Sequence, residues 1–363
     1  MTQYSNTQID APAVSLARDV VIADDVRIAA DRVEIGAGCR IGRGTRIVCP
    51  DVRIGEGTIV GAGTRIELNE HLRIGGLCQL GERLRVVGQG FTAGERLWLT
   101  DDVVVGGGGA RSADAYLTIG ARAAIMDRCY INVCRRVTIG DDTALSNNVF
   151  VLTHTLWHSA LDGGSPTFAP VTIGNDVIVF VNAVVAPGVV IGDHATVAAN
   201  ALVLGEVPAQ SVAVGNPARI VRHVPAYPRT LSADQHDAIV RAALREYVPE
   251  LGVKGLRGAL VDPDTLVVHG DGWTETIRYL AHAPAGSFSG DTRVTLSCGT
   301  VPPSARAACH FDLRAGRMEG SPTNVSEDLR DFLRRRAMRV VADRPFMPLP
   351  PANIARLRAR LHE

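Results

Sequence analysis

The sequence predicts a mainly-β fold, a parallel β-helix followed by a small α/β domain. Three observations predict it. Branched aliphatic residues recur at a step of six in groups of three, as Ile35, Ile41 and Ile47 do. A glycine follows the first residue of each group, and from about residue 226 the period stops. A step of six matches neither the strand period of two nor the helical 3.6, but it fits a coil with three short faces, each sending one side chain inward.

Seven groups of three share this pattern, and one turn of the coil takes about eighteen residues. The groups are Ile35, Ile41, Ile47; Ile54, Val60, Ile66; Ile74, Leu80, Val86; Ile119, Ile125, Ile131; Ile139, Leu145, Val151; Ile173, Val179, Val185; and Ile191, Val197, Val203. Glycine after the first inward residue suits a corner with positive φ or a close neighbouring backbone. Stacked turns would bury one continuous aliphatic column. Separate strands in a β-sandwich are the alternative, but they would not keep seven groups in register.

The composition of the chain argues against several classes of function. The 363 residues suffice for two or three domains, and the formal net charge is zero, which argues against a nucleic-acid or anionic-membrane surface. No apolar run reaches the ~20 residues of a membrane span. The first residues lack the basic and apolar segments of a signal peptide, so a cytoplasmic location is expected. Seven scattered cysteines without a CxxC pair indicate buried reduced thiols rather than disulfides or a zinc site.

The chain divides into three predicted parts. Residues 1–110 form an N-terminal hexapeptide segment, residues 111–225 a second, catalytic β-helical segment, and residues 226–363 a C-terminal α/β domain of open role: lid, acceptor clamp or oligomerisation module. The period blurs over residues 93–118, which contain four glycines, Gly106–Gly109. No Lys-Ser/Thr follows them, so we interpret this segment as a linker rather than a phosphate loop.

The C-terminal part shows helical and strand patterns. Helices are expected at residues 232–247, with Ser232 as N-cap, and at 326–339. Strands are expected at 265–269, 293–297 and 308–313. Five arginines on the second helix form either an anion site or a solvated face; they are Arg330, Arg334, Arg335, Arg336 and Arg339.

One interruption of the period points to function. Twenty-two residues separate Val151 from Ile173, so a loop over about residues 152–170 leaves the coil. Long loops on a rigid scaffold are common places for binding and catalysis. This loop begins with His154 and continues through Trp157 and His158.

At these motifs the chain resembles the hexapeptide-repeat acyltransferases, which include galactoside, maltose and nodulation-factor O-acetyltransferases. The resemblance covers residues 116–225 and rests on VFVLTHTLWHS at 149–159, PVTIGNDVIVF at 170–180, the repeat block at 185–208 and GNPARI at 215–220. It implies a left-handed parallel β-helix, acetyl-CoA as acyl donor, no metal, and a homotrimer with the cofactor groove between subunits.

The resemblance places the catalytic histidine of the family on His154. A neutral imidazole, with an ordinary pKa of ~6.5, can remove the proton of an attacking hydroxyl or amine at neutral pH. No protein nucleophile is needed, because the thiolate of CoA is already a good leaving group. Trp157 and His158 would contact the acceptor.

Five positions would hold acetyl-CoA by the same resemblance: Val181, Ala199, Gly205, Arg219 and Arg222. Arginines suit phosphate groups. Three positions depart from the family pattern. Ile178 stands where tryptophan is common, Gly205 where a lysine is common, and Cys134 at or near an acidic acceptor contact of the galactoside enzymes.

The predicted function is therefore an acyltransferase that acetylates a hydroxyl or amine of a small carbohydrate or natural product. One alternative is a non-catalytic scaffold. Another is a metalloenzyme like the γ-type carbonic anhydrases, which needs three converging histidines. His154 and His158 could supply two, with His71 or His194 as a distant third.

Overall fold

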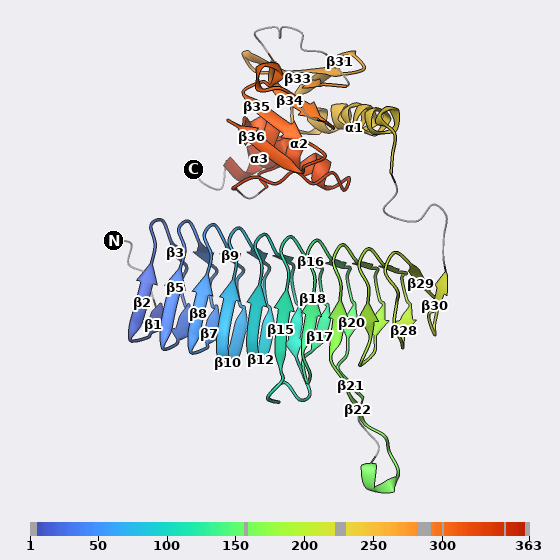
Figure 1. The fold of residues 1–363 in the computed structure, drawn as a ribbon. Coiled ribbons are helices and arrows are strands. Elements are labelled where there is room, and N and C mark those ends of the chain that lie inside the picture. Colours follow the sequence, from blue (N-terminus) through green and yellow to red (C-terminus); the bar gives the residue numbers. More distant parts are fainter. Residues whose placement is uncertain are drawn as a thin grey trace. The chain divides into compact units, whose positions relative to one another are not determined.

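The computed structural model describes residues 6–155, 159–221, 230–281, 292–299, 301–344 and 346–359. The chain forms two compact units, Met1–Arg229 and Thr230–Glu363. The first is a parallel β-helix whose short strands stack turn upon turn (Figure 1). The second is a small α/β unit with one six-stranded sheet. The predicted fold class, a mainly-β left-handed parallel β-helix with a C-terminal α/β domain, is confirmed.

The coil has three faces, which we number in chain order. Face one is built from β1 (Gln8–Asp10), β4 (Arg27–Ala29), β7 (Arg46–Val48), the first halves of β10 (Arg65–Ile74) and β12 (Arg85–Ala93), β14 (Val104–Gly106), β17 (Tyr130–Asn132), β20 (Phe150–Val151), β25 (Val184–Val185) and β28 (Leu202–Val203). Every neighbouring pair on this face is parallel and in register.

Faces two and three follow the same rule. Face two holds β2 (Ala13–Leu16), β5 (Arg32–Ile35), β8 (Asp51–Ile54), the second halves of β10 and β12, β15 (Tyr116–Ile119), β18 (Val137–Ile139), β23 (Val171–Ile173) and β26 (Val190–Ile191). Face three holds β3 (Val21–Ile22), β6 (Arg40–Ile41), β9 (Ile59–Val60), β11 (Gln79–Leu80), β13 (Trp98–Leu99), β16 (Ala124–Ile125), β19 (Ala144–Leu145), β24 (Ile178–Val179), β27 (Thr196–Val197) and β29 (Val212–Val214), and it ends with the antiparallel β30 (Arg219–Val221).

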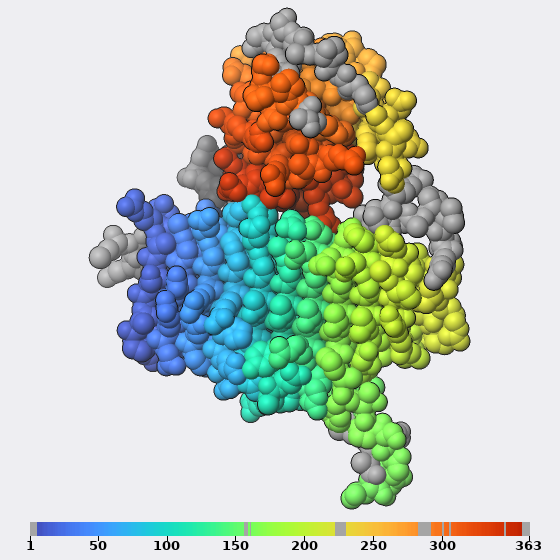
Figure 2. Space-filling view, in the orientation of Figure 1, coloured from blue at the N-terminus to red at the C-terminus, as the bar shows by residue number. Residues whose placement is uncertain are grey.

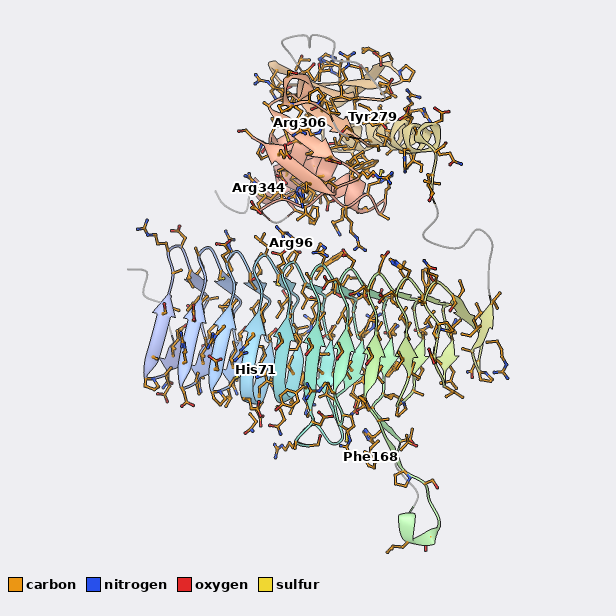
Figure 3. The ribbon with its side chains drawn as sticks, in the orientation of Figure 1. His71, Arg96, Phe168, Tyr279, Arg306 and Arg344 are labelled. Carbon is orange, nitrogen blue, oxygen red and sulfur yellow. The ribbon has the colours of Figure 1, made fainter. Side chains whose placement is uncertain are left out.

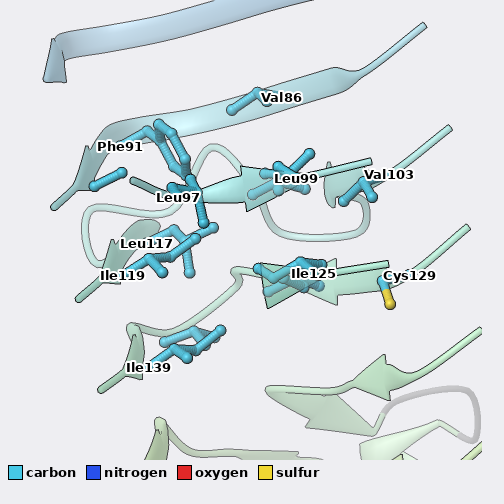
Figure 4. Close-up of a cluster of buried hydrophobic side chains, with 14 of the residues drawn as sticks. Val86, Phe91, Leu97, Leu99, Val103, Leu117, Ile119, Ile125, Cys129 and Ile139 are labelled. Carbon is cyan, nitrogen blue, oxygen red and sulfur yellow. The ribbon is translucent and has the colours of Figure 1, made fainter. Parts of the chain in front are cut away.

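The core of the coil is the aliphatic column that the period predicts. All 21 members of the seven groups are buried, none more than 4% exposed. Figure 4 shows part of this column, with Ile119, Ile125 and Ile139 among the stacked side chains. Burying one such side chain contributes about 1.5–3 kcal/mol, so the column dominates the stability of the first unit.

The column runs without a break through residues 93–118. Ala93, Leu99 and Val105 are buried at the same step of six and form a group that the sequence disguises, because its first member is alanine. Strand β12 pairs with both β14 and β15, which carries the ladder across this segment. The interpretation of residues 93–118 as a linker was therefore wrong, and the two β-helical segments form one column.

Close backbone approach explains the glycines that follow the first inward residues. At Gly36 a Cβ atom would lie 2.5 Å from the backbone nitrogen of Glu56 in the next turn, so a larger residue would push the turns apart. The cysteines are free, as expected, and six of the seven are buried. Burial raises the pKa of the Cys78 and Cys129 thiols to about 11.

The second unit packs helices against its sheet. The sheet order is β31 (Arg257–Asp262), β32 (Thr265–Gly270), β33 (Trp273–Tyr279), β34 (Thr292–Ser297), β35 (Cys309–Asp312) and β36 (Arg317–Gly320). The helices are α1 (Ala233–Val253), α2 (Asn324–Arg334) and α3 (Ala352–Ala359), with short 3₁₀ turns at Ala160–Asp162 (η1, in the first unit) and Pro303–Ala305 (η2). Ser232 caps α1, as predicted, through a reciprocal pair of hydrogen bonds with Gln235. Strands β31, β33 and β36 were not predicted.

Four of the five arginines of α2 and the residues just after it form ion pairs with acidic residues of the unit, and Arg339 is exposed. Arg330 is buried and binds Glu327 at 2.6 Å. Arg334, Arg335 and Arg336 pair with acidic residues of α2 and α1, namely Asp331, Glu250 and Glu246. The charges of these four arginines are therefore paired within the unit.

Candidate active site

Two insertions leave the coil at the same corner, between faces one and two. Residues 107–115 lie between β14 and β15, and residues 152–170 lie between β20 and β23. The second insertion projects from the coil in the ribbon and space-filling views (Figures 1 and 2). Only the turn that contains β17 separates them, so the two insertions lie on either side of the corner residues Asn132, Val133 and Cys134, which are buried.

His154 lies at the base of the projecting loop. It belongs to β21 (His154–Thr155), which pairs antiparallel with β22 (Thr167–Phe168) and so ties the two ends of the loop together. Its ring stacks on Phe168, with centroids 5.9 Å apart and planes 12° from parallel. Phe168 is at the point where the loop leaves the coil (Figure 3). The guanidinium of Arg135 lies 5.2 Å from the Phe168 ring centroid. The pairing of β21 with β22 and the stacking on Phe168 together orient the imidazole of His154.

A buried amide holds one ring nitrogen of His154. The Nδ1 atom is 2.9 Å from Oδ1 of Asn132, whose side chain is fully buried at the end of β17. The amide cannot be turned around, because its Nδ2 donates to the carbonyl oxygens of Gly106 and Gly108 at 3.0 and 2.9 Å. An oxygen must therefore face His154, so Nδ1 carries the proton and Nε2 keeps its lone pair.

The same amide oxygen is held by two further donors. The hydroxyl of Thr153 donates to it at 2.6 Å, and the backbone N–H of Cys134 donates at 3.2 Å. The Thr153 hydroxyl also accepts the backbone N–H of Arg135 at 3.1 Å. Every hydrogen-bonding position of the buried Asn132 amide is thus occupied, which makes its position rigid.

The glycine run forms the opposite wall of the site. Gly107 and Gly109 have φ of +83° and +77°, and a Cβ on either would collide with Tyr130 or Cys134. Gly108 approaches His154: a Cβ there would lie 3.2 Å from Nε2. The lone pair of Nε2 therefore lies beside an exposed backbone without side chains. The insertion is anchored by the Ser112 hydroxyl, which donates to the Cys134 carbonyl at 2.6 Å.

The residues predicted to bind acetyl-CoA lie farther along the coil. Val181 and Ala199 occupy the corner between faces three and one in successive turns, where the Asn200 N–H donates to the Val181 carbonyl at 3.0 Å. Gly205 lies on the corner of His154, and no atom would come within 4 Å of its Cβ. Arg219 is exposed on β30. These positions border face one on both sides rather than meeting at one point.

Three predicted site residues cannot be placed, and a fourth lies in the site. Trp157, His158 and Arg222 lie outside the described residues. Cys134 is buried and contributes its backbone to the site.

The described part of the chain contains no group of three histidine, cysteine or acidic side chains able to hold a metal ion. His71 binds the Thr92 hydroxyl at 3.1 Å and His194 binds Asp176 at 3.0 Å, so each has a partner away from His154. Among the same residues, no helix is long and apolar enough to cross a membrane.

Residues 170–205 match the family model described as bacterial transferase hexapeptide (six repeats). Galactoside O-acetyltransferase of Escherichia coli K12 is 37% identical over 90 residues, 24% of this chain and 44% of the relative. A putative lipopolysaccharide biosynthesis O-acetyl transferase, WbbJ, of the same organism is 32% identical over 111 residues, 27% of this chain and 56% of the relative.

A solved galactoside acetyltransferase in complex with coenzyme A is 26% identical, with a TM-score of 0.28, over 39% of this chain and 66% of that one. The chain spans about half the length of the curated relatives described above. The resemblance to the hexapeptide-repeat acyltransferases predicted from the sequence is confirmed by the family match and these relatives.

Proposed function

We propose that the protein transfers an acetyl group from acetyl-CoA to a hydroxyl or amine of a carbohydrate or similar acceptor. The observation that carries this proposal is the fixed tautomer of His154, with Nδ1–H bound to Asn132 and the Nε2 lone pair beside the open glycine wall. Two relatives named as O-acetyltransferases, which this chain matches over about half their length, support the same reaction.

For this reaction the chain supplies a general base, His154, and a preorganised hydrogen-bond partner of that base, Asn132. For a hydroxyl acceptor, Nε2 of His154 would take the proton as the oxygen attacks, and the imidazolium would keep its Nδ1–H bond to the Asn132 oxygen. Acetyl-CoA would supply the thioester carbonyl and a thiolate leaving group. The C–S bond breaks, an ester bond forms, and the proton held on Nε2 passes to the thiolate. The exposed backbone of Gly107–Gly109 offers N–H groups as candidates for the oxyanion.

The residues present fit the cofactor. Gly205 leaves open surface on the corner of His154, two turns beyond it, while Ala199 is exposed on the next corner. Phe150 is 42% exposed and Leu204 is 62% exposed. These two apolar side chains suit the apolar part of a pantetheine arm. Arg219 and Arg222 would meet phosphates. Glycine at 205 removes one cation, so the phosphates depend more on these arginines.

A homotrimer belongs to the same proposal. Face three exposes Val21, Ile59, Trp98 and Ile178 by 37–47%, all on outward positions of the face. Arg40 and Gln79 alternate with the first three of these residues in the same register. A row that mixes exposed apolar and polar side chains suits side-by-side packing of identical coils about a closed symmetry axis.

Substitution of His154 tests the proposal. His154→Ala should lower kcat for thiol release in the presence of sugar acceptors by about 10²–10⁴-fold while leaving the Kd of acetyl-CoA unchanged. His269→Ala, a histidine in the second unit, is the matched control and should keep full activity. Full activity of His154→Ala would remove the base from the mechanism. A folded wild-type protein that binds no acetyl-CoA would favour the scaffold function.

A further inference from the structure

Four arginines form a ladder on face one. Arg27, Arg46, Arg65 and Arg85 occupy the same register position in β4, β7, β10 and β12, so each lies directly beside the next. All four residues are exposed. Because neighbouring strands are ~4.8 Å apart, the ladder covers roughly 14 Å along the coil.

The ladder differs from several arginines of face two, which pair with carboxylates. On face two, Arg32 pairs with Glu34 at 3.3 Å, and Arg53 and Arg73 pair with Asp51 at 3.1 and 3.4 Å. For the ladder side chains, the described part of the chain shows no ion pair or hydrogen bond. Like charges directly opposite each other destabilise a sheet. Among the described residues no carboxylate pairs with a ladder side chain, since Glu67 of the adjacent row pairs with Arg111. An external anion would therefore relieve the repulsion.

The ladder leads to the candidate active site. A groove of about 390 Å³ begins at its last member and is lined by Arg85, Glu67, Val87 and the insertion residues Gly107 and Gly109–Ser112. Gly108, between two of these lining residues, is the residue that approaches Nε2 of His154. Arg111 adds a further guanidinium, 3.6 Å from Glu67. A path lined by arginines therefore runs from Arg27 along face one to His154.

The row beside the ladder indicates the kind of anion. Its members are Ala29, Val48, Glu67 and Val87, in register with one another. Proteins that bind single-stranded nucleic acid usually present aromatic side chains for base stacking next to their basic groove, and this row has none. Guanidinium groups pair well with carboxylates. The apolar members of the row, Ala29, Val48 and Val87, leave room for sugar rings, and its acidic member, Glu67, pairs with Arg111.

We propose that the acceptor is an anionic glycan, a chain of sugars bearing carboxylates, that lies along the arginine ladder and presents one hydroxyl to His154. The ladder would bind sugars that do not react, while the groove beside the glycine wall would receive the sugar that is acetylated. This inference deepens the proposed function and rests on it for the reaction, but the binding track can be tested without catalysis.

The test measures glycan binding by calorimetry on the full chain at low salt, with oligogalacturonate as the anionic probe and maltohexaose as the neutral one. The wild type should bind only oligogalacturonate, and binding should weaken with salt because exposed charges are screened beyond ~10 Å at 0.1 M. The double variant Arg46→Gln/Arg65→Gln should bind about tenfold more weakly, since each exposed ion pair contributes modestly.

The matched control is Arg53→Gln/Arg73→Gln, which removes the same charge from neighbouring strands of face two. It should bind like the wild type. Equal weakening by both double variants would overturn the proposal that the arginine ladder binds the glycan. Binding of maltohexaose as tight as that of oligogalacturonate would also overturn it. Tighter binding of a single-stranded oligothymidylate than of oligogalacturonate would overturn the glycan assignment. Acetyl-CoA binding is measured in parallel: its absence refutes the proposed function alone, whereas absence of glycan binding refutes the track alone.

Discussion

Removal of the Asn132 amide is the sharpest perturbation of the candidate active site. This side chain is fully buried and makes five hydrogen bonds: two from Nδ2 to glycine carbonyls and three to Oδ1 from Cys134, Thr153 and His154. Asn132→Ala removes all five and leaves the buried N–H of Cys134 without its acceptor. At about 1 kcal/mol net for each bond, and with some solvent entering the corner, we expect a loss of about 3–5 kcal/mol in the free energy of unfolding.

The effect on catalysis should exceed what the loss of stability explains. Without Oδ1, nothing fixes the proton on Nδ1 or the direction of Nε2, so kcat should fall about 10²-fold in folded protein while the Kd of acetyl-CoA stays unchanged. In a His154→Ala background the same change should lower kcat little further, because both substitutions remove one function. The assay is steady-state thiol release, at a temperature where thermal unfolding shows each variant to be folded.

Asn69→Ala is the control, since Asn69 is an exposed asparagine on the same corner with one side-chain bond, to Gln89 at 2.8 Å. It should change stability by no more than about 0.5 kcal/mol and leave kcat intact. If Asn132→Ala proves too unstable, Asn132→Asp keeps an oxygen for Nδ1 but loses both donors to the glycine wall. Folded Asn132→Ala with kcat within about twofold of the wild type would refute the tautomer argument.

Two further predictions follow from local geometry. Gly108→Ala places a methyl group 3.2 Å from Nε2 of His154 without backbone strain, so kcat should fall about tenfold with acetyl-CoA binding unchanged, and Gly252→Ala, which meets no neighbour, should have no effect on kcat. In the second unit, burial and then Arg306 lower the pKa of His310, so below pH ~6.5 the unfolded chain binds a proton that the folded chain does not, and stability is lost as the pH falls. The protection factors of the β34 and β35 amides, which compare each exchange rate with the intrinsic rate at the same pH, should therefore be lower at about pH 5.5 than at pH 7.5 in the wild type but not in His310→Gln. Equal pH dependence of the protection factors in both proteins would contradict the assignment.

The period of six predicted the coil because each inward position is decided locally, by one branched side chain per face. The prediction failed only where that side chain was small: Ala93 is buried like the other first members, but alanine does not mark a position as inward. The linker interpretation of residues 93–118 followed from this one residue and from the glycines after it. Those glycines are required by the neighbours they touch, Tyr130 and Cys134, which lie more than twenty residues away.

The base was predictable and its partner was not. His154 stands at the start of an insertion, which a sequence displays directly. Asn132 stands one residue after an inward isoleucine, the same register position that Val48 and Glu67 occupy on exposed parts of face one. Nothing local distinguishes it. Its burial comes from two insertions that cover the corner from either side, and that arrangement depends on contacts between turns.

The shared corner is what turns two ordinary insertions into a site. Residues 107–115 and 152–170 leave the coil two turns apart, a separation of roughly 10 Å at the base, and the first insertion brings the backbone of Gly108 beside Nε2 of His154. Had either insertion left the coil at a different corner, the two would lie on different sides of the prism and Asn132 would be open to water. A buried amide can fix the tautomer of His154 only where both insertions exclude solvent. The regular turns therefore set the distance between the two walls, and the irregular ones supply the chemistry.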